Sequence, residues 1–209
     1  MSSPKHRKRL GAAARRETIL AAAIPEFAAS GYGGTRVSDI AAAIGVTEPV
    51  VFQNFSTKSG LFAAVLDRMS EEVVRYLSVL GAHSPDVADL LAVLLAHEHQ
   101  DRLHSKGAFG TMFAEAANNS EPSIRNAGRR AHARTMEAVV ELLRRGQHEG
   151  SIRDDIDATN LGWLVLSQIH ARQFRRAHSH TSPTLEHALL KALLDAIRRE
   201  PAPERGPSR

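Results

Sequence analysis

Two neighbouring carboxamides have the chemistry needed to recognise the edge of a base. Gln53 and Asn54 end the segment VSDIAAAIGVTEPVVFQNF, residues 37–55. A carboxamide exposed on a helix donates and accepts at once, which matches the adenine edge in the DNA major groove. Val50 can touch a thymine methyl group, and Glu48 can accept a hydrogen bond from cytosine. The types and spacing of these residues therefore suit recognition of base pairs.

The same segment has the residues needed to place that helix. Ala41 is small enough for two helices to cross closely, and Gly45 supplies the backbone freedom for a tight turn. Val51 is spaced to pack back onto the first helix, Thr47 can cap the second, and Pro49 is tolerated in its first turn. An ordinary helical hairpin with a polar surface has a similar local pattern, so this alternative stays open.

The distribution of charge favours nucleic-acid binding at the N-terminal end. The first 60 residues contain eight Lys and Arg against four Asp and Glu, and the rest of the chain is balanced at 19 of each sign. The net charge of +4 therefore lies entirely in the first quarter. A basic arm, Lys5–Arg9, can add non-specific phosphate contacts, and a tail without a role is the alternative.

Composition excludes several other classes of protein. The 209 residues include no cysteine, which rules out disulfides and cysteine nucleophiles, and we expect a cytoplasmic protein. No apolar run is long enough to span a bilayer, and no secretory signal follows the basic start. We find no glycine-rich phosphate loop and no compact Ser-His-Asp signature, so we expect neither an enzyme nor a cofactor.

Apolar residues recur at helical spacing almost throughout, which predicts an all-α protein of about nine helices. The first helix is expected to end at Gly31. The predicted helices cover residues 15–30, two short segments within 37–55, and then 58–80, 85–100, 109–117, 122–146, 157–177 and 183–199.

Residues 18–66 resemble the DNA-binding domain of the TetR family of transcriptional regulators. The matching positions are Ile19, Leu20, Ala23, Phe27, Gly31, Tyr32, Thr35, Asp39 to Ala41, Gly45, Val46, Phe52, Phe55, Lys58 and Leu61. The resemblance implies a three-helix helix-turn-helix domain at the N-terminus. It also implies a C-terminal helical domain for ligand binding and dimerisation.

The resemblance implies a phosphate contact for Lys58, with Arg36, Ser38 and Thr47 in similar roles. The full set of expected DNA-binding residues is Arg36, Ser38, Thr47, Glu48, Val50, Phe52, Gln53, Asn54 and Lys58. Three positions depart from the family pattern: Phe52 replaces the usual Tyr, Val50 a common Thr, and Ser59 an acidic residue. A dimer of the same fold with weakened or lost DNA binding, acting as a small-molecule or protein-binding module, is therefore kept as an alternative.

We expect a basic arm over residues 1–13, a DNA-binding domain over 14–60, an effector-binding and dimerisation domain over 61–200, and a tail over 201–209. The two last helices carry apolar stripes that suit a four-helix bundle across a two-fold axis, or alternatively only the protomer's own core. The predicted interface comprises Leu161, Leu164, Val165, Arg172, Leu185, Leu189, Leu193 and Ile197.

The predicted effector is a mostly apolar small molecule with a few hydrogen-bonding groups. Its expected pocket comprises His97, Phe109, Met112, Phe113, Met136, Val140, Trp163, Gln168 and His170, and a plain core is the competing interpretation. The eleven histidines form no recognisable ligand set, so no metal site is predicted. The expected partners are a palindromic DNA operator, the effector and a second copy of the chain.

Overall fold

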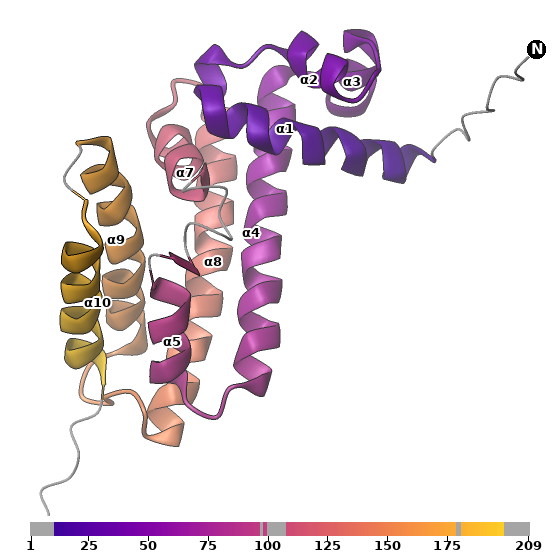
Figure 1. The fold of residues 1–209 in the computed structure, drawn as a ribbon. Helices are drawn as coiled ribbons and strands as arrows, with labels where there is room; N and C mark the ends of the chain where they lie inside the picture. The colour runs from indigo at the N-terminus through magenta and orange to yellow at the C-terminus, as the bar shows by residue number, and fades with distance from the viewer. Residues whose placement is uncertain (1–10, 97, 100–107, 179–180, 199–209) are drawn as a thin grey trace, which may run out of the picture. The chain divides into compact units, whose positions relative to one another are not determined.

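The computed structural model describes residues 11–96, 98–99, 108–178 and 181–198, without the side chains of residues 108, 109 and 173. Every regular element in these ranges is a helix, which confirms the all-α prediction (Figure 1). The helices are α1 (Ala12–Gly34), α2 (Val37–Ala43), α3 (Glu48–Phe55), α4 (Lys58–His83), α5 (Val87–Leu95), α7 (Ala108–Asn118), α8 (Pro122–Glu149), α9 (Ala158–Ala177) and α10 (Pro183–Ile197).

The chain forms two compact units, and their boundary differs from the one expected at residue 60. The first unit contains the described residues up to Arg68 together with Met112–Arg129. The second contains the described residues of Met69–Thr111 and of the chain from Arg130 onward. Helices α4 and α8 each contribute residues to both units. No helix in the described ranges is long and apolar enough to cross a membrane.

The first unit is organised around one apolar face of α1. Ile19, Ala23 and Phe27 are fully buried there, at the helical spacing that the sequence predicts. The Phe27 ring meets the Phe62 ring of α4 edge to face, with centroids 4.8 Å apart. This contact joins α1 to the beginning of α4, the helix that directly follows α3.

Gly31 interrupts α1 where the sequence predicts that the helix ends, but the helix continues beyond it to Gly34. The φ of 66° and ψ of 178° at Gly31 lie outside the helical region, and a further turn runs from there to Gly34. A residue with a Cβ atom is strained at this φ, whereas glycine is not. The hydroxyl of Thr35 then donates to the carbonyl of Gly31 at 2.7 Å and helps to close the end of the helix.

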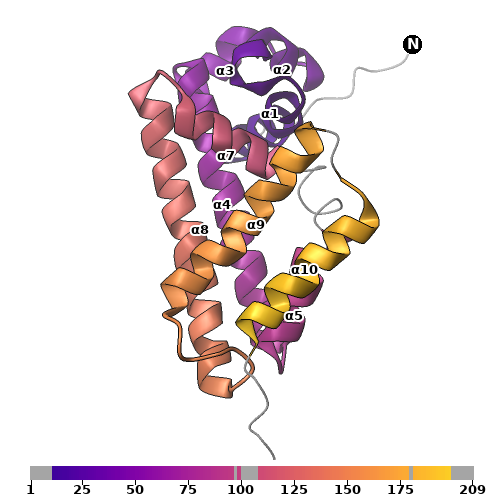
Figure 2. The same cartoon turned by 90° about the vertical axis from the view of Figure 1, so that its left-hand side faces the viewer.

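The second unit has its own core, to which α5, α8, α9 and α10 contribute most of the buried side chains. Helix α10 lies beside α9 and α5 (Figures 1 and 2). Helix α5 is shorter than the predicted 85–100, because Asp86 caps its start through the Asp89 amide and Ala96 leaves the helical conformation. The fully or nearly buried core includes Val87, Leu91, Val139, Val140, Leu143, Ile152, Leu161, Val165, Leu193 and Ile197.

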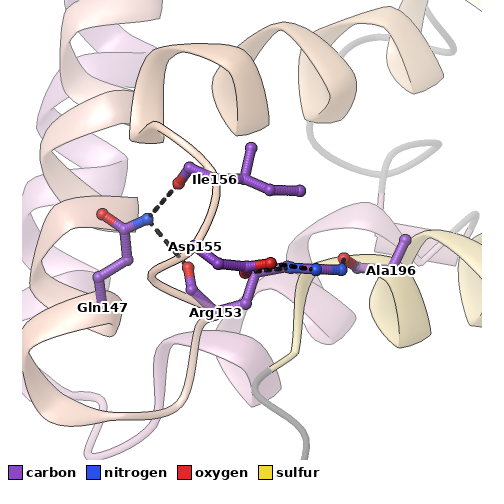
Figure 3. Close-up of polar contacts among 5 residues, drawn as sticks. All are labelled: Gln147, Arg153, Asp155, Ile156 and Ala196. Atoms are coloured by element: carbon purple, nitrogen blue, oxygen red, sulfur yellow. Dashed lines mark hydrogen bonds and ion pairs between the residues drawn. The ribbon is translucent and has the colours of Figure 1, made fainter.

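Polar groups fix the connection between α8 and α9 (Figure 3). The side-chain amide of Gln147 donates to the carbonyls of Arg153 and Ile156, at 2.9 and 2.8 Å. Arg153 makes two hydrogen bonds to Asp155 and a third to the carbonyl of Ala196 in α10. The hydrogen bonds from Arg153 hold the pKa of Asp155 below its usual value. The loop is therefore tied to both α8 and α10.

We expect Gln147→Ala to lower the free energy of unfolding by about 1–3 kcal/mol, because two part-buried carbonyls lose their donor. Urea denaturation followed by circular dichroism measures this loss. Arg144→Ala is the control, since Arg144 is exposed and makes a long ion pair of 3.8 Å with Glu141 and a weak coulombic interaction with the exposed Asp157. Equal, small effects of the two changes would contradict the assigned role of Gln147.

Candidate DNA-binding surface

Helices α2 and α3 are joined by the tight turn that the sequence predicts. Gly45 has a φ of 66°, and the amide of Val46 donates back to the carbonyl of Ala41 at 3.0 Å. Ile40 on α2 and Val51 on α3 are buried almost completely, at 0% and 1% exposure. The two helices therefore pack on each other through small and branched apolar side chains, and the opposite face of α3 is left outward.

The C-terminal end of α3 is held from α1. The guanidinium of Arg16 lies 4.1 Å from the centroid of the Phe55 ring, and its Nη1 donates to the carbonyl of Asn54 at 2.7 Å. A cation at this end of a helix also interacts favourably with the helix dipole. The role of Arg16 was not anticipated from the sequence, because a contact between residues that are 38 positions apart leaves no local pattern.

The expected base-contacting residues differ in how they lie. Glu48, Phe52 and Gln53 are exposed, whereas Val50 and Asn54 are half-buried. The Asn54 side-chain amide donates to the carbonyl of Val50 at 2.8 Å, one turn earlier in α3. Gln53 is thus the exposed amide of the pair, and Asn54 is engaged with its own helix.

The expected phosphate-contacting residues lie at helix starts. Arg36 occupies the N-terminal cap position of α2, and Ser38 lies in its first turn; both are exposed. Thr47 occupies the cap position of α3, but its side chain makes no capping hydrogen bond, so this part of the prediction is wrong. Its exposed hydroxyl is not used to cap α3.

Lys58 begins α4 and is half-buried. Its Nζ lies 4.7 Å from the centroid of the Tyr32 ring and donates to the carbonyl of Gly33 at 3.4 Å. Thr57 precedes it, and the Thr57 hydroxyl accepts a hydrogen bond from the Gly60 amide at 2.9 Å. Thr57 therefore caps α4, a role that the sequence analysis missed although a Thr directly before a predicted helix is a recognised signal.

The expected pocket residues do not form one described site. Met112 and Phe113 are buried in the first unit, and Met136, Val140, Trp163, Gln168 and His170 belong to the second. His97 and the side chain of Phe109 lie outside the described residues.

Within the second unit, some of these residues meet. A Cβ atom on Gly162 would lie 3.0 Å from both Met136 and Val140, so α8 and α9 approach closely there. The Trp163 ring packs on the imidazole of His132, with centroids 5.3 Å apart, and His170 lies 6.2 Å from the same imidazole. Gln168 lines a cavity of about 10 Å³ beside Arg172 and Glu186, the volume of about one water molecule.

His132 was not anticipated from the sequence. Its Nε2 is buried without a hydrogen-bond partner among the described residues. Burial lowers the pKa of His132, and the positive charge of a protonated His170 lowers it further. A larger open groove of about 690 Å³, also unforeseen, runs between α4 and α8 in the same unit. Its walls include Leu77, Arg134 and Leu142.

The residues expected at the dimer interface divide into two groups. Leu161, Val165, Leu193 and Ile197 are buried in the core of the second unit. Arg172 is also buried and lies 3.7 Å from Glu186, which Arg175 holds with two hydrogen bonds of 2.9 and 2.8 Å. Leu164 and Leu185 are exposed, and Leu189 is half-buried.

No group of three or more acidic or histidine side chains in the described ranges is arranged to hold a metal. His97, His104 and His180 lie outside those ranges. His99 is described, and its Nε2 lies 3.0 Å from the hydroxyl oxygen of Tyr76.

Helix α3 is short, and the turn before it and helix α1 hold its inner side. Its outward side chains are polar, and cations lie at the starts of α2 and α4. This arrangement defines a helix-turn-helix DNA-binding protein. Residues 19–65 match the model of the bacterial regulatory proteins of the tetR family. The chain is 31% identical over 177 residues to the HTH-type transcriptional repressor AcnR of Corynebacterium diphtheriae. The aligned region covers 84% of this chain and 87% of AcnR. The chain belongs to the TetR family of transcriptional regulators.

Solved structures of the family have the same fold. A TetR-family regulator from Rhodococcus sp. superposes with a TM-score of 0.74 over 88% of this chain and 98% of its own, at 22% identity. The regulator FadR from Bacillus subtilis, solved in complex with stearoyl-CoA, gives a TM-score of 0.70 over 87% and 98%, at 17% identity. The predicted fold class is confirmed.

We expect Thr57→Ala to lower the free energy of unfolding by about 1 kcal/mol, because the first turn of α4 loses a capping acceptor. Thr57→Ser keeps the hydroxyl and is expected to remain within a few tenths of a kcal/mol of the wild type, roughly the difference between good caps. Chemical denaturation of the three proteins measures both values. A serine variant as unstable as the alanine variant would contradict the capping role.

Proposed function

We propose that the protein is a homodimeric repressor that binds a palindromic operator and is released when a small molecule binds the second unit. The observation that carries the proposal is the surface of α3. An exposed Gln53 and Glu48 lie on a buried scaffold, and Arg36, Thr47 and Lys58 are placed at the helix starts around them. We propose repression rather than activation because the relative AcnR is a transcriptional repressor.

In this proposal, each group of residues has a distinct role at the DNA. Arg36, Ser38, Thr47 and Lys58 contact phosphates and fix the register of the protein on the duplex. Gln53 recognises adenine, and Glu48 accepts from cytosine. Phe52 and Val50 supply apolar contacts to thymine methyl groups. Asn54 contributes to base recognition only if its hydrogen bond to the Val50 carbonyl opens, so we assign it the smaller part.

The dimer is proposed to form through the outward faces of α9 and α10. Trp163, Leu164, Phe174 and Leu185 are large apolar side chains that remain exposed on these two helices. Monomeric proteins seldom expose several such side chains on adjacent elements. Leu164, Leu185 and Leu189 keep their predicted interface role, and the buried stripe formed by Leu161, Val165, Leu193 and Ile197 supports this surface from the core.

The effector is proposed to bind between helices of the second unit, near Met136, Val140, His132 and His170. The buried Nε2 of His132 is a hydrogen-bonding atom that a ligand can satisfy. FadR, the structural neighbour, was solved with stearoyl-CoA, a molecule with a long apolar part. Because α4 and α8 continue from the second unit into the first, a ligand that prefers shifted helices changes the separation of the two α3 helices and lowers DNA affinity.

The main test is selection of bound sequences from a random pool of duplexes, followed by titration of the winning duplex across salt concentrations. We expect a palindrome whose half-sites are roughly 34–36 Å apart, bound with steep salt dependence. The absence of enrichment would contradict operator binding. It would favour the alternative in which the protein keeps the fold but has lost DNA binding. Phe52 would contribute to that loss, because it lacks the hydroxyl of the Tyr that the family usually has there.

Substitutions separate the two kinds of contact on the selected duplex. Gln53→Ala is expected to remove about 1–3 kcal/mol of discrimination at one base pair and to relax sequence preference there. Lys58→Ala is expected to weaken binding to all sequences alike and to reduce the salt slope by about 1. Binding titrations on the operator and on a point-mutated operator measure both effects. Uniform losses from both changes would contradict the assignment of Gln53.

We expect Leu164→Glu to shift the protein from dimer to monomer, because a charge would be buried in the proposed interface. Sedimentation or light scattering over a range of concentrations measures the molar mass. Val93→Glu is the matched control: Val93 is also an exposed apolar residue, at 58% against 44% for Leu164, but it lies on α5, outside the proposed interface. A Leu164→Glu protein that stays dimeric would place the interface elsewhere.

A further inference from the structure

Two carboxylates from the α7–α8 segment bind the break in α1. The backbone amide of Tyr32 donates to both oxygens of the Glu115 carboxylate, at 2.8 Å each. The Tyr32 hydroxyl donates to the carboxylate of Glu121 at 2.6 Å. Hydrogen bonds with an ionised partner are shorter and stronger than neutral ones. Both ends of Tyr32 are thus held by acids more than 80 residues away in the sequence.

The break at Gly31 makes the first of these contacts possible. Residues 32–34 begin a new helical turn after Gly31, so the Tyr32 amide lies at the start of that turn, where a helix does not supply partners for its first amides. A Cβ atom on Gly31 would lie only 3.2 Å from the two Glu115 oxygens. Glycine at this position therefore permits both the backbone conformation and the close approach of the carboxylate.

The second contact changes the properties of the Tyr32 ring. Burial, followed by the hydrogen bond and the negative charge of Glu121, raises the pKa of Tyr32 to about 12, and a hydrogen bond with Ser59 offsets only part of this rise. The phenol therefore stays protonated at neutral pH and donates continuously to Glu121. A phenol that donates to a carboxylate is polarised toward a more negative ring, which strengthens its attraction for a cation.

That cation is Lys58, the residue assigned to a DNA phosphate. Its Nζ lies 4.7 Å from the Tyr32 centroid and is within 3.4 Å of the Gly33 carbonyl, in the turn that Glu115 anchors. The Tyr32 ring also packs on Phe62 at 5.3 Å, so its own position is fixed by the core. A continuous set of contacts thus runs from Glu115 and Glu121 through Tyr32 to Lys58.

We propose that Glu115, Glu121 and Tyr32, here called the carboxylate latch, position Lys58 for its phosphate contact and tie DNA affinity to the α7–α8 segment. The latch deepens the proposed function and rests on the DNA binding stated there. Glu121 directly precedes α8, whose later residues belong to the second unit. A ligand-driven displacement of α8 would therefore move Glu121 and weaken its hydrogen bond with the Tyr32 hydroxyl. Lys58 would then lose its fixed contact with the Tyr32 ring.

The test uses the full-length protein and the duplex selected above. Tyr32→Phe keeps the ring but removes its donor, and Glu121→Gln removes the charge of the acceptor. Each is expected to weaken binding by about 3- to 10-fold, which is the scale of the net contribution of one ordinary hydrogen bond. Glu26→Gln is the matched control, because it removes the same charge from a position on α1 of the same unit that is half-buried, as Glu121 is.

Combination with Lys58→Ala distinguishes positioning from a general structural role. If the latch acts through Lys58, Tyr32→Phe and Glu121→Gln cause no further loss in the Lys58→Ala protein. Losses that persist undiminished in that background would overturn the proposal, as would variants that bind like Glu26→Gln. Thermal unfolding of every variant identifies losses that come from unfolding.

A second measurement does not depend on DNA. In ¹⁵N-labelled protein, Glu115→Gln is expected to shift the Tyr32 amide resonance, because the amide donates to both oxygens of the Glu115 carboxylate, and Glu26→Gln is expected to leave it in place. A Tyr32 amide resonance that Glu115→Gln does not move would overturn the latch. A wild-type protein that binds no duplex would overturn the proposed function itself, whereas normal binding with unaffected variants would overturn the latch alone.

Discussion

An eight-residue helix does not hold its shape in water, because so few hydrogen bonds cannot offset the cost of starting it. Helix α3 is such a helix, and everything proposed for DNA binding depends on packing that it receives from outside. Val51 and Phe55 are buried on its inner side, and Arg16 packs on the Phe55 ring and donates to the carbonyl of Asn54 near the end of the helix. The outward side chains of α3 can therefore be polar, because the stability of the fold does not depend on them. Their types can follow the requirements of DNA recognition.

The sequence predicted this part well because its signals are local. Helical periodicity, a glycine at the turn and the distribution of charge placed α2, α3 and the start of α4 correctly. The expectation for Thr47 failed, since cap residue types do not ensure that the side chain turns back to the helix. The contacts of Arg16, Glu115 and Glu121 were missed, because hydrogen bonds across 38 to 89 residues leave no pattern in a single sequence.

The second unit was predicted in outline only. An apolar stripe at heptad-like spacing does not say which neighbour it faces, so the proposed interface residues divided between core and surface. Leu161 and Val165 lie in the core, while Leu164, adjacent in the same stripe, is exposed. The expected pocket residues were likewise chosen by type and helix, and Met112 and Met136 belong to different compact units. His132, with its buried Nε2, attracted no attention because a lone histidine has no signature.

Because Gly31 and the Glu115 carboxylate approach closely, the residue types that fit at positions 31 and 115 depend on each other. A side chain at position 31 would meet the carboxylate of residue 115 at 3.2 Å and would also be strained at a φ of 66°. A larger residue at position 31 would therefore require the carboxylate of residue 115 to shift and the backbone to accept a strained φ. Paired changes at these two positions among related chains would record where this connection between distant segments has been lost or rebuilt.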